Sequence, residues 1–227
     1  MTRSPEIRLI IDVFHATTSG QKGEILQSFY DQGINPERFS NGHGQGRGFY
    51  VWTTMEKASE HARTIKLGEL SKSGSSEGAP VVVVASVVFD PQKWELDVEA
   101  HRGIANEFLN SLVRMNGGEL HLVEPMGSKI VLKSFEEMPR NFAAHFLRED
   151  GGKTVHGLAA GKDDPNLRTG EILGRVFAAI RTSEFSSQWQ DFVAQKVSSM
   201  ADIGLALKYI GDQRLPIRRI LPIEEQS

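Results

Sequence analysis

The run from Val81 to Phe89, VVVVASVVF, constrains the fold of this chain more than any other feature of its sequence. It has no polar alternation, so a strand formed by it would present apolar side chains on both faces. The sequence therefore predicts a strand near the centre of a sheet, with other elements covering both of its faces.

Strand patterns and helix patterns surround this run on both sides. Strands are predicted from their β-branched and aromatic content at residues 9–14, 49–52, 119–123, 129–135, 205–210 and 216–221. Helices are predicted from apolar residues at helical spacing in residues 22–30, 53–70, 99–113, 170–180 and 187–197. This mixture of elements predicts an α+β fold.

The chain has 227 residues, which is enough for one large domain or two small ones. No internal repeat and no long biased linker marks a boundary, so we expect a single domain over residues 1–227. Residues 139–169 are polar and Gly-rich, and we expect them to form a lid, an insertion or a partly mobile loop. The whole insertion is expected to span residues 139–197.

Composition and charge exclude several classes of protein. Hydrophobic residues make up 39% and charged residues 24%, as in ordinary globular proteins rather than disordered or collagen-like chains. A formal charge of -3 argues against a general polyanion binder. The absence of Cys excludes disulfides, thiolate metal sites and a Cys nucleophile, and the seven His show no metal-site spacing, so no metal is expected.

The N-terminal residues, Met1 to Asp12, carry charges within their apolar stretch, so we do not expect a signal peptide. No run approaches the length of a membrane span. The sequence therefore predicts a cytoplasmic protein without a membrane partner, although delivery as an effector remains open.

Two segments carry the chemistry that the sequence suggests. His15 follows the first predicted strand, and the glycine loop at residues 41–48 opens into Phe49, Tyr50 and Val51. A Rossmann glycine loop follows a strand and opens a helix, whereas this loop precedes a strand, so that interpretation fails. No P-loop, zinc-protease or nucleophile-elbow motif is present.

These segments belong to a series of motifs with a familiar order. The series is His15-Ala16-Thr17, Gly33-Ile34-Asn35-Pro36, Gly46-Arg47-Gly48-Phe49-Tyr50-Val51 and Lys57-Ala58-Ser59-Glu60-His61. It resembles the ADP-ribosyltransferase superfamily, in its poly(ADP-ribose) polymerase and diphtheria-toxin-like branch with a His-Tyr-Glu site. The match extends to Ala62, and beyond it only the order of strands agrees. The resemblance implies a split β-sheet with flanking helices, here with a helical and loop insertion.

The resemblance also implies NAD as a co-substrate and gives roles to its motif residues. His15 would bind a ribose hydroxyl, the backbone of Ala16 would hold the nicotinamide amide, and Tyr50 and His61 would stack on the ring. The full set of NAD-binding residues that it implies is His15, Ala16, Thr17, Gly48, Phe49, Tyr50 and His61. Gly48 is expected to let the ligand approach the backbone closely.

Two positions depart from the family pattern. Ala16 stands where the family has Gly, and Ala58 stands where it has a Ser that bonds the nicotinamide amide. Affinity for NAD is then expected to be weaker or to be supplied elsewhere, while the inferred catalysis remains.

Catalysis on this pattern also requires a carboxylate, because the nicotinamide–ribose bond breaks through a cationic, oxocarbenium-like state. The resemblance implies His15, Tyr50 and Glu119 as the catalytic residues, because Glu119 begins the predicted strand ELHLV after a Gly-Gly turn, which resembles the family's Glu-Tyr-x-Val segment at the start of a later strand. Glu124, at the far end of that strand, and Asp202, before the C-terminal strands, are the alternatives.

The leading hypothesis is an NAD-dependent mono-ADP-ribosyltransferase acting on a protein or nucleic-acid acceptor. The size and the lack of recognition regions favour a bacterial or phage toxin or effector. The same site with water as acceptor would be an NAD glycohydrolase, and with an RNA 2'-phosphate it would be a phosphotransferase. Without an acid in reach, it would be a non-catalytic NAD or ADP-ribose-binding module. The oligomeric state is left open.

A small basic cluster lies near the C-terminus of the sequence. It consists of Lys208, Arg214, Arg218 and Arg219. Two interpretations stand side by side: contact with the NAD pyrophosphate or a nucleic-acid acceptor, or a solvated strand edge protected by charge.

Overall fold

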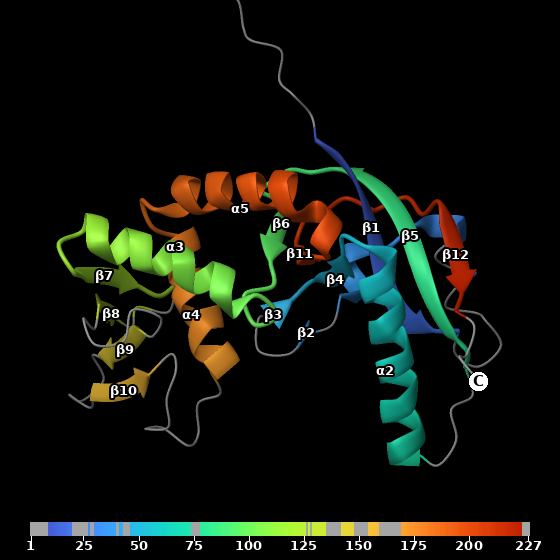
Figure 1. The fold of residues 1–227 in the computed structure, drawn as a ribbon, viewed down its shortest axis with the longest axis horizontal. Helices are drawn as coiled ribbons and strands as arrows, with labels where there is room; N and C mark the ends of the chain where they lie inside the picture. Colours follow the sequence, from blue (N-terminus) through green and yellow to red (C-terminus); the bar gives the residue numbers. More distant parts are fainter. Residues whose placement is uncertain are drawn as a thin grey trace, which may run out of the picture. The chain divides into compact units, whose positions relative to one another are not determined.

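The computed structural model describes residues 9–19, 27, 30–39, 41–42, 46–73, 78–125, 127, 129–134, 142–147, 154–158 and 169–223. The fold is α+β, with mainly antiparallel sheets and several helices (Figure 1). The chain divides into two compact units. The first comprises residues 1–40, 47–96 and 194–227, and the second comprises residues 41–46 and 97–193. One domain with an insertion at residues 139–197 stays a prediction, and the longer segment of the second unit begins at residue 97.

The first unit is built on a six-stranded sheet in the order β12-β5-β1-β4-β11-β6. Its strands are β1 (Ile10–Thr18), β4 (Phe49–Trp52), β5 (Pro80–Val88), β6 (Trp94–Leu96), β11 (Ala206–Tyr209) and β12 (Arg219–Pro222). Neighbouring strands pair antiparallel throughout this sheet.

The apolar run from Val81 to Val88 forms all but the first residue of β5. Residues Val81 to Ala85 are at most 4% exposed, which confirms that the strand is buried on both faces. Its place is second from one edge, because the short strand β12 is added outside it. The sheet is therefore anchored by β5, with β1 alongside it over nine residue pairs.

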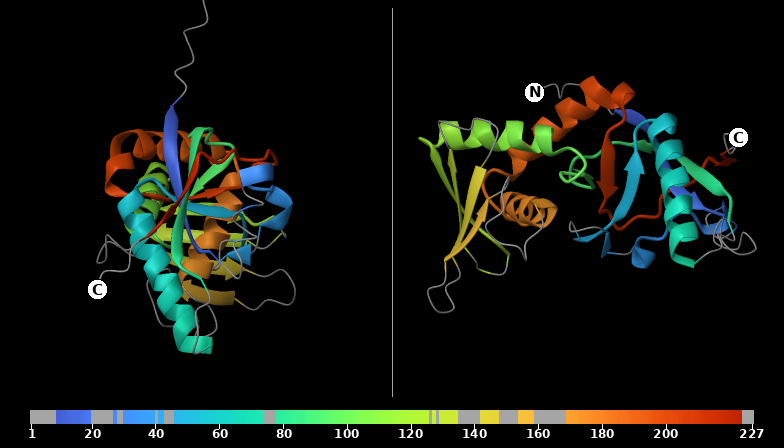
Figure 2. Two further views of the ribbon diagram at one scale, coloured as in Figure 1. Left: turned by 90° about the vertical axis from the view of Figure 1, so that its right-hand side faces the viewer. Right: turned by 60° about the horizontal axis from the view of Figure 1, so that its bottom comes forward.

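Helix α2 (Met55–Ser73) covers one face of β1 and β5 (Figure 2). Ala58 and Ala62 are fully buried and pack with Ala16, Val82 and Val84 of the two strands. Alanines on this side of the helix let it approach the sheet closely, so the predicted helix at residues 53–70 is confirmed with a C-terminal extension.

The first strand is longer than its apolar pattern predicts. Residues Ala16 to Thr18 pair with Val82 to Pro80 of β5, so His15 lies inside β1 and does not enter a loop. The prediction that the strand ends at Phe14 is wrong, because the continuous partner strand β5 supplies main-chain hydrogen bonds to residues of low apolarity.

The second unit contains a four-stranded antiparallel sheet in the order β10-β9-β8-β7. Its strands are β7 (Glu119–Val123), β8 (Lys129–Ser134), β9 (Phe142–Leu147) and β10 (Thr154–Leu158). Helix α3 (Arg102–Met115) packs on β7 and β8, and α4 (Thr169–Arg181) packs on β7. The rings of Phe108 from α3, Phe177 from α4 and Trp189 from α5 (Ser186–Met200) lie 4.3–6.4 Å apart between centroids and form an aromatic core between these helices.

Residues 139–169, for which the sequence predicted a lid, an insertion or a partly mobile loop, contain two strands, β9 and β10. Pairing with β8 gives β9 its hydrogen bonds, and β10 pairs with β9 in turn. A strand that is stabilised by pairing with its neighbours needs no strong apolar alternation of its own. The apolar pattern of the sequence therefore did not predict β9 and β10. The other residues of this stretch lie outside the described part of the chain, apart from Thr169 in α4.

The two C-terminal strands are confirmed, but they do not form a hairpin. β11 lies between β4 and β6, while β12 pairs with β5 toward the opposite edge of the sheet. The predicted helix at residues 22–30 lies mostly outside the described residues.

Four short elements complete the described structure: η2 (Pro36–Arg38), β2 (Asn41–Gly42), β3 (Gly46–Arg47) and η3 (Ala201–Ile203). None of the helices in the described ranges is both long enough and apolar enough to cross a membrane.

Candidate functional site

His15 lies in the middle of β1, next to β4 in the first unit. Its Nδ1 atom lies 2.8 Å from the carbonyl oxygen of Tyr50. A carbonyl oxygen only accepts hydrogen bonds, so Nδ1 carries the proton and donates it. In the neutral ring, Nε2 then has an unprotonated lone pair and can accept a hydrogen bond from a hydroxyl group.

The environment of His15 keeps the ring neutral. Burial lowers the pKa of His15 from 6.5 to about 4, which outweighs the opposing effect of the hydrogen bond to Tyr50. The charge of the nearby His61 lowers this pKa further by a smaller amount. At neutral pH, the imidazole is therefore a hydrogen-bond acceptor at Nε2 and carries no charge.

Aromatic side chains hold the His15 ring in place on one face of the sheet. The rings of His15 and Phe49 are 4.2 Å apart, and Phe39 stacks on Phe49 at 5.8 Å. The row continues through Tyr209, 6.2 Å from Phe39, to Trp94, 4.9 Å from Tyr209. The orientation of the imidazole is thus fixed by packing as well as by its hydrogen bond.

Tyr50 leaves β4 on the face opposite to Phe49, because successive side chains of a strand alternate. Trp52 shares that face, and its ring lies 6.0 Å from the ring of His61 on α2. Tyr50 is half-buried and His61 is exposed. The structure brings the backbone of Tyr50, rather than its ring, to His15.

The remaining motif residues of β1 lie next to this group. Ala16 is buried against α2, while Thr17 is half-buried and pairs with Val81 of β5. His15, Ala16 and Thr17 therefore occupy three successive positions beside the strand that carries Phe49 and Tyr50.

Gly48 has a packing role that the sequence did not indicate. A Cβ atom at this position would lie 2.3 Å from Cγ and 2.5 Å from Cδ of Lys208, and 3.1 Å from the carbonyl oxygen of Tyr209. The side chain of Lys208 fills the space above Gly48, so glycine is required there by the fold itself.

Lys208 belongs to a buried ion pair that sequence reasoning missed. Its Nζ lies 2.6 Å from Oε2 of Glu95, which is opposite it in the pairing of β11 with β6. Lys208 is 4% exposed and Glu95 is 9% exposed. The prediction that Lys208 belongs to a surface basic cluster is therefore wrong. In the pairing of β11 with β4, Lys208 lies opposite Tyr50.

Two of the three candidate carboxylates belong to the second unit and have cationic or titratable partners there. Glu119 begins β7, and its Oε1 lies 2.9 Å from Nε2 of His121 at an exposed position. Glu124 is 8% exposed and accepts two hydrogen bonds of 2.7 Å from Arg175 of α4. This bidentate geometry is typical of a structural ion pair that fixes α4 to the end of β7.

The third candidate, Asp202, belongs to the same unit as His15 and Tyr50. It lies in η3 immediately before β11, and it is exposed. The chain around it is fixed to β4, since Thr53 donates its hydroxyl to the carbonyl oxygen of Ala201 and accepts the amide of Leu205. Gly204, with a φ of 82°, makes the turn from η3 into β11.

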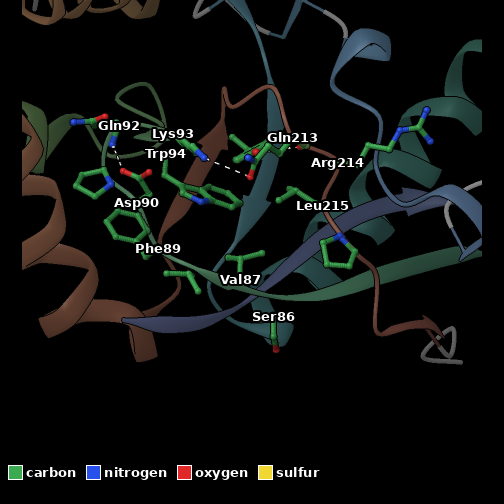
Figure 3. A pocket seen from close by; sticks show the side chains of 14 residues that line it. Ser86, Val87, Phe89, Asp90, Gln92, Lys93, Trp94, Gln213, Arg214 and Leu215 are labelled. Carbon is green, nitrogen blue, oxygen red and sulfur yellow. Dashed lines mark hydrogen bonds between the residues drawn. The ribbon is translucent and has the colours of Figure 1, made fainter. Parts of the chain in front are cut away.

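A pocket of about 850 Å³ lies elsewhere in the first unit (Figure 3). It is formed by the end of β5, the turn from Phe89 to Lys93, the end of β11 and the segment from Gln213 to Pro216. Neither His15 nor Tyr50 lines it. This pocket and the pair of His15 and Tyr50 are thus distinct features of the first unit.

Within the described residues, no group of three or more His, Asp or Glu side chains is arranged to hold a metal ion. In comparisons with known proteins, no protein-family model, no curated protein and no solved structure matches this chain.

Proposed function

We propose that this chain is an NAD-dependent mono-ADP-ribosyltransferase, with the split-sheet fold of the ADP-ribosyltransferase superfamily. The observation that carries the proposal is the fixed tautomer of His15. Its Nδ1 donates to the carbonyl oxygen of Tyr50 on the adjacent strand, which leaves Nε2 as an acceptor. A neutral, oriented acceptor at this motif position is what binding of a ribose hydroxyl requires.

The pairing of β1 supports the split sheet. This strand pairs with β5 over nine residue pairs but, among the described residues, with β4 only through Phe14 and Trp52. His15 follows directly after this last pair, and its ring bonds the main chain of the neighbouring strand. A substrate positioned at this point would meet both strands that carry the motif residues.

The chemistry follows from what these groups can do. The bond between nicotinamide and ribose breaks with its electron pair on nicotinamide, and the nucleophilic atom of the acceptor then bonds to the ribose carbon and loses its proton. His15 orients the ribose through Nε2, which accepts a hydrogen bond from a ribose hydroxyl. Stacking of the Tyr50 ring on the flat leaving group stays a prediction, because that ring leaves β4 on the face opposite to Phe49 and the His15 ring. A carboxylate stabilises the positive charge that develops on the ribose.

We assign the carboxylate first to Asp202 and keep Glu119 as the alternative. Asp202 belongs to the unit that contains His15, and it lies in η3, a short turn before the strand that pairs with β4. Glu119 contacts His121, and Glu124 is bound by Arg175, so both have local partners in the second unit.

A second function is favoured by the composition of β11. From Gly204 to Tyr209 the sequence is GLALKY, which contains no carboxylate in the strand beside Tyr50. If Asp202 does not reach the substrate, the domain would bind NAD or ADP-ribose without turning it over.

The test is release of nicotinamide from labelled NAD, with buffer alone, with protein extract, and with RNA that carries a 2'-phosphate as acceptors. The variants are His15→Ala, Asp202→Asn and Glu119→Gln. We expect His15→Ala to slow release by about 10²-fold or more, Asp202→Asn to slow it by about 10²–10³-fold, and Glu119→Gln to leave it within about twofold.

Each outcome has a defined meaning. Label on protein or nucleic acid identifies the transferase, release without transfer identifies a glycohydrolase, and loss of the RNA 2'-phosphate identifies the phosphotransferase. Loss of release in Glu119→Gln, with Asp202→Asn active, would return the carboxylate role to Glu119. NAD binding without release would identify the non-catalytic module, and absence of binding would overturn the proposal.

A further inference from the structure

Strand β5 has an open edge over its last residues. β12 pairs with β5 from Val81 to Val84 and no further, and the amide of Arg218 donates to the carbonyl oxygen of Val84. Within the described part of the chain, no strand continues this edge past Val84. The residues of β5 from Ala85 to Val88 thus extend beyond the part that β12 covers.

The direction of the main-chain groups at this edge follows from the ladder. Ile223 donates to Pro80 on the β12 side, and Phe89 donates to Leu9 on the β1 side. Because hydrogen-bonding residues alternate along an antiparallel strand, the even-numbered residues of β5 face β12. The N–H and C=O groups of Ser86 and Val88 therefore point to the open side.

This open edge lines the pocket of about 850 Å³ (Figure 3). The floor is apolar and closed, because Phe89, Trp94 and Tyr209 are at most 7% exposed. The segment from Gln213 to Pro216 forms another part of the lining. The pocket thus combines a row of main-chain groups, a flat apolar floor and a boundary that contains polar side chains.

Positive charge exceeds negative charge around this edge. Lys93 and Arg214 line the pocket, and the exposed Arg218 and Arg219 lie where β12 begins. Among the described residues, three carboxylates lie nearby, and one of them, the exposed Asp212, is close enough to help burial raise the pKa of Tyr209. Asp12 accepts from Ser86 and lies 4.0 Å from Arg218, and Asp90 accepts the amide of Gln92.

We propose that this pocket binds an extended acidic peptide, which adds to β5 as a strand beside Ser86 and Val88. Main-chain hydrogen bonds would supply the affinity, and the excess of basic side chains would select acidic residues in the peptide. A nucleic acid is disfavoured, since Trp94 and Tyr209 are at most 3% exposed and offer no face for stacking bases. The proposal is independent of NAD chemistry, and its test needs no NAD.

The experiment measures binding of a dye-labelled peptide of alternating Glu and Val by fluorescence anisotropy, using the full chain. The comparison probes are the same peptide with Lys in place of Glu, and a single-stranded RNA oligonucleotide. Val88→Pro removes the exposed N–H, and Val88→Ala is the matched control that keeps it. Arg214→Glu tests the charge.

We expect the acidic peptide to bind, Val88→Pro to weaken it by about tenfold or more, and Val88→Ala to stay within about twofold of the original chain. Arg214→Glu should reduce preference for the acidic peptide over the basic one. A second measurement does not depend on a variant that folds. In the original chain, the peptide should slow hydrogen exchange at the amides of Ser86 and Val88.

Three results would overturn the proposal. These are failure of the acidic peptide to bind, binding without protection of the Ser86 and Val88 amides, and tighter binding of the RNA or the basic peptide.

Discussion

The two units of this chain differ in whether their candidate polar residues already have hydrogen-bond partners. In the first unit, packing and one hydrogen bond fix the His15 ring, and Nε2 receives no hydrogen bond from the residues that the structure describes. In the second unit, Glu119 contacts His121 and Glu124 is held by two hydrogen bonds from Arg175. Residues that are oriented but still able to accept a ligand are better candidates for a site than residues whose partners are already in place.

The largest expected effect separates His15 from Glu119. His15→Ala removes the oriented acceptor and should reduce NAD turnover by about 10²-fold or more. Glu119→Gln should change turnover by less than about twofold, since its carboxylate contacts an exposed His121. Initial rates of nicotinamide release measure both. Equal losses in the two variants would remove the distinction between the units.

A second prediction concerns stability in the second unit. Glu124→Ala leaves the Arg175 guanidinium without its carboxylate and should lower the free energy of unfolding by about 3 kcal/mol. Glu119→Ala, at the first residue of β7, is the matched control, because its ion pair with His121 is exposed and the loss of that pair should cost less than about 1 kcal/mol. Urea denaturation followed by circular dichroism measures both changes. Similar costs would show that the Glu124–Arg175 pair does not hold this unit together.

The pKa of His15 predicts how stability depends on pH. The unfolded chain binds a proton at His15 below about pH 6.5, while the folded chain does so only near pH 4. The free energy of unfolding should therefore be highest above pH 6.5 and fall by up to about 3 kcal/mol as the pH drops through this window.

The control for this pH dependence is His15→Gln, which keeps a side-chain donor for the Tyr50 carbonyl but does not titrate. The slope of stability against pH, measured by urea denaturation at several pH values, should be smaller in His15→Gln than in the original chain. Equal slopes would mean that His15 is not held neutral by burial.

The smallest effects come from a pair of glycine variants, one in each unit. Gly48→Ala should destabilise the chain by about 2 kcal/mol, because the new methyl group would collide with the buried stem of Lys208. Gly103→Ala, in the first turn of α3, meets nothing within 4 Å and should stabilise it by about 0.5 kcal/mol. Thermal unfolding should give a lower midpoint temperature for Gly48→Ala and a slightly higher one for Gly103→Ala. An unchanged midpoint in Gly48→Ala would show that the side chain of Lys208 can move aside.

Elements with a strong local pattern could be predicted from the sequence. The unbroken apolar run gave β5, and small buried residues at helical spacing gave α2. The aromatic strand after the glycine loop gave β4. In each case the side chains that define the pattern are also those that face the core, so local and tertiary preferences agree.

The elements and contacts that the sequence did not predict depend on partners that are distant along the chain. β9 and β10 are stabilised by pairing rather than by their own composition, and the ion pair of Lys208 with Glu95 joins two strands that are far apart in the chain. The same limit applies to the candidate carboxylate. Whether an acid belongs to the unit of His15 is decided by tertiary contacts, which local spacing does not encode.

The most direct test of the central claim is nitrogen-15 NMR of the His15 imidazole during titration with NAD. The account predicts a neutral ring at pH 7 with the proton on Nδ1, and a change in the Nε2 resonance as NAD binds. A ring protonated on Nε2, or a His15 resonance that NAD in excess does not move, would contradict it.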